Sequence, residues 1–277
     1  ESQESRERFL AGLPDYLFGT VGGNTTCVEV RLSDDSVILF DAGTGLSRFS
    51  TVTAKREKHL REFHMFFSHF HWDHLQGFPF FTPQMFDPKC RLDIYSHDEH
   101  TEEILRSQMR PPNFPITMDD MQAEIVFHTI DDTPVRIGRA EVSSRKMKHP
   151  GNCYSYKISE GGRSCIFSTD TELQEEDFRK TEENTSFYGG TNLIVMDTQY
   201  TLDEAIEKYD WGHSSYSLAV DFVAEWGIQT LVLFHHEPQY NDAKMYGIQK
   251  NASWYKSHLD TQDLRILLAT EGLELEV

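Results

Sequence analysis

Short apolar runs recur along the chain and are separated by longer segments in which apolar positions recur at helical spacing. Six of these runs predict strands, at residues 37–40, 63–67, 165–167, 193–196, 231–234 and 266–268. The helical periodicity predicts helices at residues 47–60, 99–109, 214–226 and 243–259. Short strands that alternate with amphipathic helices are typical of a layered α/β fold.

A dense group of polar side chains follows the apolar run at residues 63–67. Residues 68–74 read Ser-His-Phe-His-Trp-Asp-His, which places three imidazoles and one carboxylate within six positions. A loop at the carboxyl end of a buried strand is where open α/β sheets usually place their chemistry. Imidazole nitrogen and carboxylate oxygen are ligands that borderline divalent ions such as zinc accept. The segment therefore predicts a metal site rather than a His-rich surface turn.

Three later strand ends offer side chains of the same kind. His149 ends a strand expected over residues 141–148, and Asp170 closely follows the run at residues 165–167. His235 and His236 both follow the run at residues 231–234, and the residues alone do not separate them as ligands. These positions extend the predicted metal site beyond a single loop.

The string at residues 68–74 resembles the hallmark of the metallo-β-lactamase-fold hydrolases. Asp197, then Gly212-His213-Ser214-Ser215, then a strand ending in histidine before Pro238, follow the order of motifs in the ribonuclease Z and phosphodiesterase branch. The resemblance runs from about Gly19 to Pro238. It implies a four-layer αββα sandwich, with two mixed β-sheets flanked by helices and the metals where strand ends converge. It also favours one domain over residues 13–277.

The resemblance implies two divalent ions per chain, with zinc as the first expectation and manganese or iron as alternatives. Each ion has three ligands of its own, and one carboxylate bridges the two ions. The implied ligands are His69, His71 and His149 for one ion, Asp73, His74 and His235 for the other, and Asp170 as the bridge. Asp41, after the run at residues 37–40, is expected to orient a ligand imidazole, a frequent need at metal sites.

Two residues are implied to act in catalysis. Asp73 has a second role as the carboxylate that accepts a proton from the attacking water. His213 lies outside the ligand set and is implied to protonate the leaving group, a task suited to imidazole near neutral pH. The alternative for His213 is a histidine that only caps or packs at the start of a helix.

The favoured function is a metal-dependent phosphodiesterase that cleaves a small nucleotide or cyclic nucleotide, because two ions suit in-line displacement at phosphorus. Asp170 stands where the lactamases of the superfamily have a thiolate, and His71 stands where its oxygen-reducing iron branch has a glutamate. Both of those activities are disfavoured. The alternatives are a glyoxalase II-like thioester hydrolase, a ribonuclease and, last, a metal-binding sensor without turnover.

Charge bears on the substrate. The chain has 45 acidic and 26 basic residues, a formal net charge of −19. Nucleic-acid binders usually present a basic face to the phosphate backbone. Ribonuclease Z also carries a flexible basic arm, whereas residues 171–192 here are short and acidic. A small phosphodiester is therefore the expected substrate, and transfer RNA is disfavoured.

The remaining expectations concern the setting of the domain. No apolar run is long enough to span a membrane and no leader is visible, so a cytoplasmic protein with no membrane partner is expected. Residues 1–12 are polar and are expected to be a linker or trimmed segment, with an upstream regulatory domain absent from this chain. A homodimer is left open. The four cysteines lack paired metal spacing, and buried free thiols are expected.

Overall fold

The computed structural model describes residues 2–13, 20–259, 261 and 263–277, so Gly19, where the resemblance begins, lies outside the described residues, as do residues 1 and 14–18 of the predicted linker and domain. The chain divides into two compact units. The N-terminal unit comprises residues 24–147 and 151–163, and the C-terminal unit comprises residues 1–23, 148–150 and 164–277. The assignment of residues 13–277 to a single domain stays a prediction.

The N-terminal unit is built on a five-stranded sheet of order β1-β2-β3-β4-β5. Its strands are β1 (Val28–Arg31), β2 (Val37–Phe40), β3 (Glu62–Phe66), β4 (Arg91–Ser96) and β5 (Glu124–Thr129). Strand β1 is antiparallel to β2, and the other neighbours are parallel. The carboxyl ends of β2 and β3 therefore lie at one edge, so Asp41 and the residue 68–74 loop emerge side by side.

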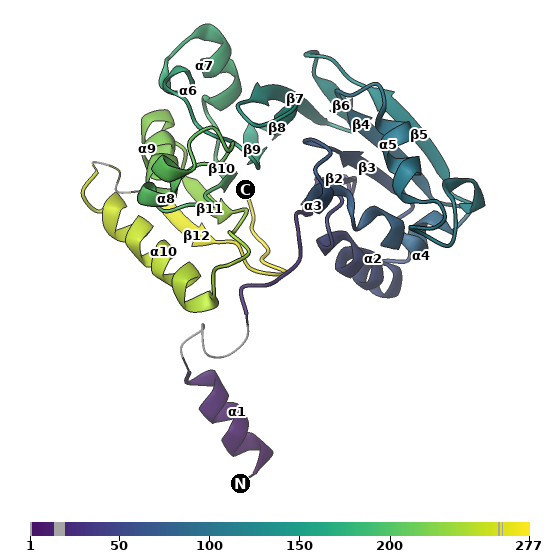
Figure 1. Cartoon of the computed structure of the whole chain (residues 1–277), viewed down its shortest axis with the longest axis horizontal. Helices are drawn as coiled ribbons and strands as arrows, with labels where there is room; N and C mark the ends of the chain where they lie inside the picture. Colours follow the sequence, from purple (N-terminus) through teal and green to yellow (C-terminus); the bar gives the residue numbers. More distant parts are fainter. Residues whose placement is uncertain (1, 14–19, 260, 262) are drawn as a thin grey trace. The chain divides into compact units, whose positions relative to one another are not determined.

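Helices and an antiparallel ribbon complete this unit (Figure 1). The helices are α2 (Gly45–Arg56), α3 (Trp72–Leu75), η2 (Phe78–Phe80), α4 (Thr82–Met85), α5 (Thr101–Gln108) and η3 (Met118–Asp120). The ribbon consists of β6 (Val135–Ile137), β7 (Ala140–Met147) and β8 (Cys153–Glu160). The core joins apolar residues of the sheet, such as Phe63, Met65 and Ile94, to Leu46 of α2 and Leu105 of α5.

The C-terminal unit has four parallel strands of order β12-β11-β10-β9. They are β9 (Arg163–Ser168), β10 (Leu193–Asp197), β11 (Thr230–Phe234) and β12 (Arg265–Leu268). The helices are α1 (Gln3–Ala11), α6 (Glu175–Phe178), α7 (Glu182–Tyr188), α8 (Leu202–Glu207), α9 (Tyr216–Trp226) and α10 (Asp242–Lys256). Helix α9 contacts β10 and β11, and α10 contacts α9 and β12.

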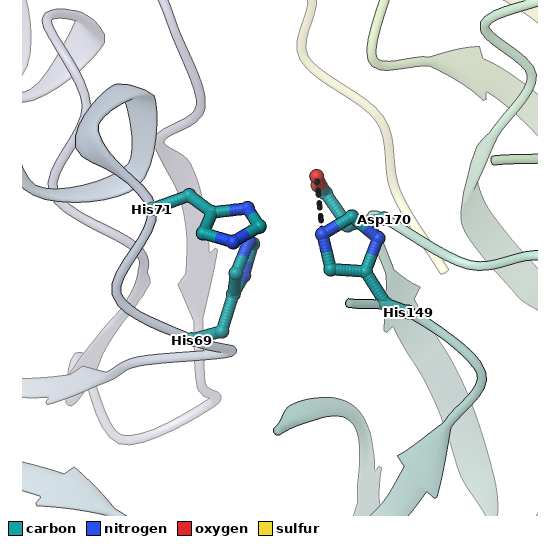
Figure 2. A group of neighbouring side chains, drawn as sticks. All are labelled: His69, His71, His149 and Asp170. Atoms are coloured by element: carbon teal, nitrogen blue, oxygen red, sulfur yellow. Dashed lines mark ion pairs between the residues drawn. The ribbon is translucent and has the colours of Figure 1, made fainter. Parts of the chain in front are cut away.

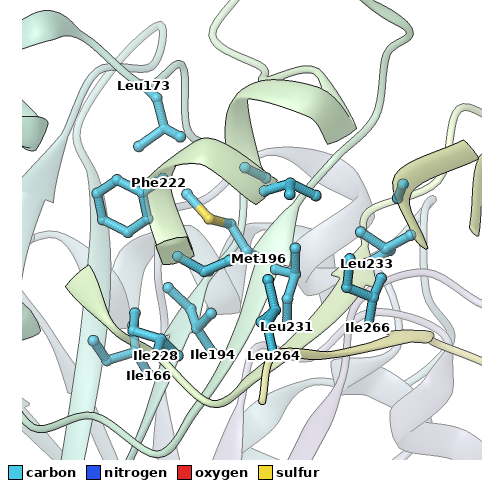
Figure 3. Packing of buried hydrophobic residues seen from close by; sticks show 14 of the residues in the cluster. Ile166, Leu173, Ile194, Met196, Phe222, Ile228, Leu231, Leu233, Leu264 and Ile266 are labelled. Carbon is cyan, nitrogen blue, oxygen red and sulfur yellow. The ribbon is translucent and has the colours of Figure 1, made fainter. Parts of the chain in front are cut away.

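The apolar core of the C-terminal unit positions the ends of its strands. Figure 3 shows Ile194 and Met196 of β10, Leu231 and Leu233 of β11 and Phe222 of α9 as members of one buried apolar cluster. Strands of a parallel sheet are buried on both faces and read as continuous apolar runs. Burial of this cluster therefore fixes the strand ends from which Asp170, Asp197 and His235 emerge.

The fold class predicted from the sequence is confirmed, because the described residues form two mixed β-sheets flanked by helices. The six strands predicted from apolar runs, the strand expected over residues 141–148 and all four predicted helices are present, with ends shifted by a few residues. The helix predicted from residue 214 begins at Tyr216, because Ser215 caps it by accepting a hydrogen bond from the Leu218 N–H. The segment expected as a linker contains helix α1. Among the described residues, no helix combines the length and apolar character that a membrane span requires.

Candidate functional site

The loop after β3 gathers the imidazoles of the N-terminal unit. The His69 ring centroid lies 4.4 Å from that of His71 and 4.3 Å from that of His74. The Nε2 atom of His74 lies 3.2 Å from a carboxylate oxygen of Asp73. His69 and His74 are buried, whereas His71 is exposed. Figure 2 shows His69 and His71 on this loop with their rings close together. The four predicted ligands of this unit are thus side by side.

The Asp41 carboxylate orients the histidines of this loop through hydrogen bonds. Its carboxylate accepts hydrogen bonds from the Ser68 N–H and hydroxyl, each at 2.7 Å, and from Nδ1 of His74 at 2.8 Å. Complete burial raises the pKa of Asp41, and the His74 and Ser68 donors oppose that rise. The Ser68 hydroxyl is used as a donor, so Nδ1 of His69, 3.0 Å away, donates to the Ser68 oxygen. In His69 and His74, Nε2 is therefore the nitrogen that carries the lone pair a metal needs.

Asp170 is the centre of the corresponding group in the C-terminal unit. One of its oxygens lies 3.7 Å from Nε2 of His149, and the other lies 3.3 Å from Nε2 of His235. Figure 2 shows the first of these pairs. Nδ1 of His149 donates to the Gly212 carbonyl at 2.9 Å, which again leaves the lone pair on Nε2. Nε2 of His236 instead donates to the Ala269 carbonyl at 2.9 Å, so only His235 is directed toward Asp170.

Three residues of the site have left-handed backbone conformations. Asp41, Asp170 and His235 have φ of 60°, 47° and 57°, and each follows the last residues of a buried parallel strand. Such a conformation costs about 1–3 kcal/mol for a residue other than glycine and persists only where the surroundings fix it. Strain of this kind at three strand ends is typical of a functional edge rather than of a packing solution.

His213 is held by a buried carboxylate. Its Nδ1 atom donates to Asp197 at 2.6 Å, and the side chains of His213 and Asp197 are 13% and 0% exposed. Asp197 also accepts the backbone N–H groups of Thr171 and Gln199, each at 3.0 Å. Asp197, His213 and His235 have ligand atoms within 4.8 Å of one another and could hold an ion. Because three donors already engage Asp197, its role is to orient His213.

Close packing and hydrogen bonds fix the position of residues 212–215. Gly212 has a φ of 88°, and a Cβ atom there would lie 2.4 Å from Nδ1 of His149. Its N–H donates to Glu172 at 2.9 Å. The Ser214 hydroxyl donates to the Thr171 carbonyl at 2.5 Å and accepts the N–H of residue 173 at 3.0 Å. The segment thus fastens His213 to the loop that carries Asp170.

This packing makes a prediction for Gly212→Ala. The new methyl group would collide with His149 and adopt a strained φ, so we expect a lower Tm and weaker metal binding. Gly227→Ala is the matched control, since Gly227 has a φ of 65° but a Cβ atom there meets no neighbour within 4 Å. It should lose about 1–2 kcal/mol of stability, from the strained φ alone, and keep its metal. Calorimetry and metal analysis test this, and equal metal content in the two variants would refute it.

The donor set in each unit fits divalent ions. Each group combines imidazole nitrogens with a carboxylate, and hydrogen bonds to Asp41, Ser68 and Gly212 fix the tautomers of three imidazoles. Ligand histidines commonly donate their other N–H in this way. The structure brings together the predicted residues of each unit, and their division between two ions stays a prediction.

Two contributors were missed by the sequence reasoning. Asp197 was noted only as the start of a motif, although it holds His213. Glu172, which accepts the Gly212 N–H, is the second. An acid after the buried run at residues 193–196 was the available signal for Asp197, because a carboxylate at the end of a parallel strand can reach a neighbouring loop. No local pattern singles out Glu172.

Comparisons with known proteins agree with this architecture. The family described as the β-lactamase superfamily domain matches residues 37–236. Ribonuclease BN of Salmonella paratyphi C is 29% identical over 158 residues, covering 54% of this chain but only 47% of its own length. The matched part thus spans about half of that relative. Ribonuclease Z of Synechococcus sp. is 22% identical and covers 78% of this chain and 81% of its own.

Solved structures show the same fold. The metallo-β-lactamase fold protein YhfI from Bacillus subtilis aligns with a TM-score of 0.66 and 20% identity, over 90% of each chain. A diphosphatase from the PhnP family aligns with a TM-score of 0.64 and 17% identity, over 91% of this chain and 84% of its own. At these identities the likeness concerns the fold alone.

Proposed function

Because the chain belongs to the β-lactamase superfamily, we propose that it is a metal-dependent hydrolase that cleaves a phosphodiester bond in a small nucleotide or cyclic nucleotide. The observation that carries this proposal is the Asp197–His213 pair, with Nδ1 of His213 2.6 Å from the carboxylate. The same segment contacts His149, since Gly212 accepts a hydrogen bond from that imidazole. A proton donor is thereby tied directly to candidate metal ligands.

We further propose that the chain holds two divalent ions, with zinc as the first choice. The proposed sets are His69, His71 and His149, and Asp73, His74 and His235, with Asp170 shared. A pair of such ions supplies charge stabilisation for an in-line displacement at phosphorus. Asp170 suits the shared position because its two oxygens are directed at two different imidazoles.

The chain's own residues would manage the protons. Asp197 engages Nδ1 of His213, so the proton available for transfer is the one on Nε2. That proton would go to the departing alkoxide, which is a poor leaving group without it. Asp73 would accept the proton of the attacking water. Asp73 would thus act as the base and His213 as the acid.

The proposed substrate is small, although the two relatives are named ribonucleases. Residues 171–192 form two short helices, α6 and α7, whose first turns carry Glu175, Glu176, Glu182 and Glu183. The whole chain has a net charge of −19, and this acidic surface would repel the phosphodiester backbone of an RNA. A small diester needs only local neutralisation at the metals. Transfer RNA is therefore not the substrate we propose.

A substrate screen of the metal-loaded protein tests the reaction class. We expect hydrolysis of bis(p-nitrophenyl) phosphate or a cyclic nucleotide to exceed that of S-lactoylglutathione, nitrocefin or p-nitrophenyl phosphate. The monoester should be poor, because its extra charge and missing second ester suit neither the metals nor the leaving-group acid. A thioesterase rate far above every diesterase rate would instead support the glyoxalase II-like alternative.

A further inference from the structure

An exposed apolar surface lies immediately before His213 in the C-terminal unit. Leu202 and Ile206 of α8 are 54% and 68% exposed, and Tyr209 and Trp211 beyond that helix are 65% and 60% exposed. Helix α8 has no buried residue. Four large apolar side chains exposed within ten residues favour a binding role, because soluble proteins rarely expose clustered apolar surface without a function.

The segment that carries Trp211 is firmly held. The ammonium of Lys208 lies 3.4 Å from Glu237, 4.2 Å from the centre of the Tyr200 ring and 5.7 Å from that of Trp211. Asp210 accepts from Lys148 at 2.6 Å. Residues on both sides of Trp211 have left-handed backbone, with φ of 66° at 210 and 88° at 212. A fixed turn therefore displays the indole.

This turn is connected to the chemistry on both sides. The Tyr200 ring, which Lys208 covers, contacts the His213 ring edge-on with centroids 5.7 Å apart. After Trp211 the chain passes at once to Gly212, whose carbonyl accepts from His149. The aromatic surface and the proposed leaving-group acid are thus parts of one rigid segment.

We propose that Trp211 is a specificity-determining residue that stacks on the nucleobase of the substrate. This inference rests on the proposed phosphodiesterase function and names the group that the enzyme recognises besides the phosphate. Every nucleobase has a flat π-face, and stacking on an aromatic side chain binds it without requiring a basic surface. An acidic protein can therefore select a nucleotide through this ring.

The charges around Trp211 favour a base over a second copy of the chain. Asp203 and Glu207 are exposed on α8 between the apolar side chains, and Asp210 precedes Trp211. A second copy with a net charge of −19 would bring the same acids against them. A nucleobase is uncharged, so these acidic side chains do not repel it.

Two ligands that share a phosphate and a pentose test the proposal. We would measure binding of adenosine 5′-monophosphate and ribose 5-phosphate to the metal-loaded protein by calorimetry, and inhibition of bis(p-nitrophenyl) phosphate hydrolysis by each. Trp211→Ala should lower the affinity for adenosine 5′-monophosphate on the order of tenfold and leave the affinity for ribose 5-phosphate unchanged. Trp211→Phe should retain most of the affinity. Trp254→Ala is the matched control, because Trp254 is a similarly exposed indole, 65% exposed, on α10.

The outcomes separate this inference from the proposed function. Equal affinity of the wild-type protein for both ligands, or an equal loss for both in Trp211→Ala, would overturn the role of Trp211. A wild-type dimer that Trp211→Ala converts to a monomer in sedimentation would also overturn it, since a second copy would then cover the ring. Selective adenosine binding through Trp211 without hydrolysis of any diester would refute only the proposed function.

Discussion

Asp170→Ala is expected to release both divalent ions and to abolish hydrolysis, the largest effect of any single substitution in the site. The two Asp170 oxygens lie 3.7 Å and 3.3 Å from the imidazoles of His149 and His235, so its removal deprives both proposed ions of a ligand. We expect metal affinity to fall by more than about 100-fold, beyond the range seen for outer partners of metal ligands. His149→Ala should weaken the binding of one ion and leave the binding of the other unchanged. Metal analysis after dialysis measures both effects.

A control separates metal loss from unfolding. Asp221 accepts from the Tyr255 hydroxyl at 2.9 Å and lies outside the proposed ligand sets. Asp221→Ala should therefore keep its metal even if it costs some stability. Retention of two ions by Asp170→Ala, with a normal circular dichroism spectrum, would be incompatible with a bridging role.

His213→Ala is expected to keep the fold and both ions while lowering turnover of a nucleotide diester by about 10²- to 10⁴-fold, as for a lost general acid. The loss should be much smaller for a nitrophenyl ester, because nitrophenolate departs without a proton. Steady-state rates with the two substrates give the comparison. Asp73→Asn, in contrast, should impair both substrates, because it alters a metal ligand and the acceptor of the water's proton together.

Only the difference between leaving groups identifies His213 as an acid. Nδ1 of His213 donates to Asp197, so His213→Ala would lower activity even if His213 had only a structural role. Equal losses for nucleotide and nitrophenyl esters would assign His213 to structure or substrate binding. Normal metal content in the variant is required for either conclusion.

Most of the fold could be predicted because its central strands are continuously apolar. Strands β2, β10 and β11 are buried in parallel sheets and read as runs of Val, Leu, Ile and Phe. Strand β4 was missed because its sequence, Arg-Leu-Asp-Ile-Tyr-Ser, breaks the pattern. Its buried Asp93 is tolerated through pairing with Arg91 and with His128, each at 2.7 Å. Arg91 lies on the same strand, but His128 comes from the neighbouring strand β5, so that part of the compensation cannot be read from the local sequence.

The candidate site could be predicted as residue types but not as geometry. The density of histidine at residues 68–74 predicted one group of candidate ligands, and strand ends predicted the others. The resemblance implied His235 rather than His236, and the structure adds the contacts: Nε2 of His235 lies 3.3 Å from Asp170, whereas His236 donates to the Ala269 carbonyl. The hold of Asp197 on His213 likewise joins residues from two separate segments. Side-chain direction at a strained turn is set by the surrounding packing, not by the local sequence.

The proposed two-ion phosphodiesterase can be tested by titrating metal-free protein with zinc or manganese and measuring the rate of phosphodiester hydrolysis. Activity should rise to a plateau at about two ions per chain, because both proposed ions would take part in the displacement. A plateau at one ion per chain, or no diesterase activity at any metal concentration, would contradict the proposed function.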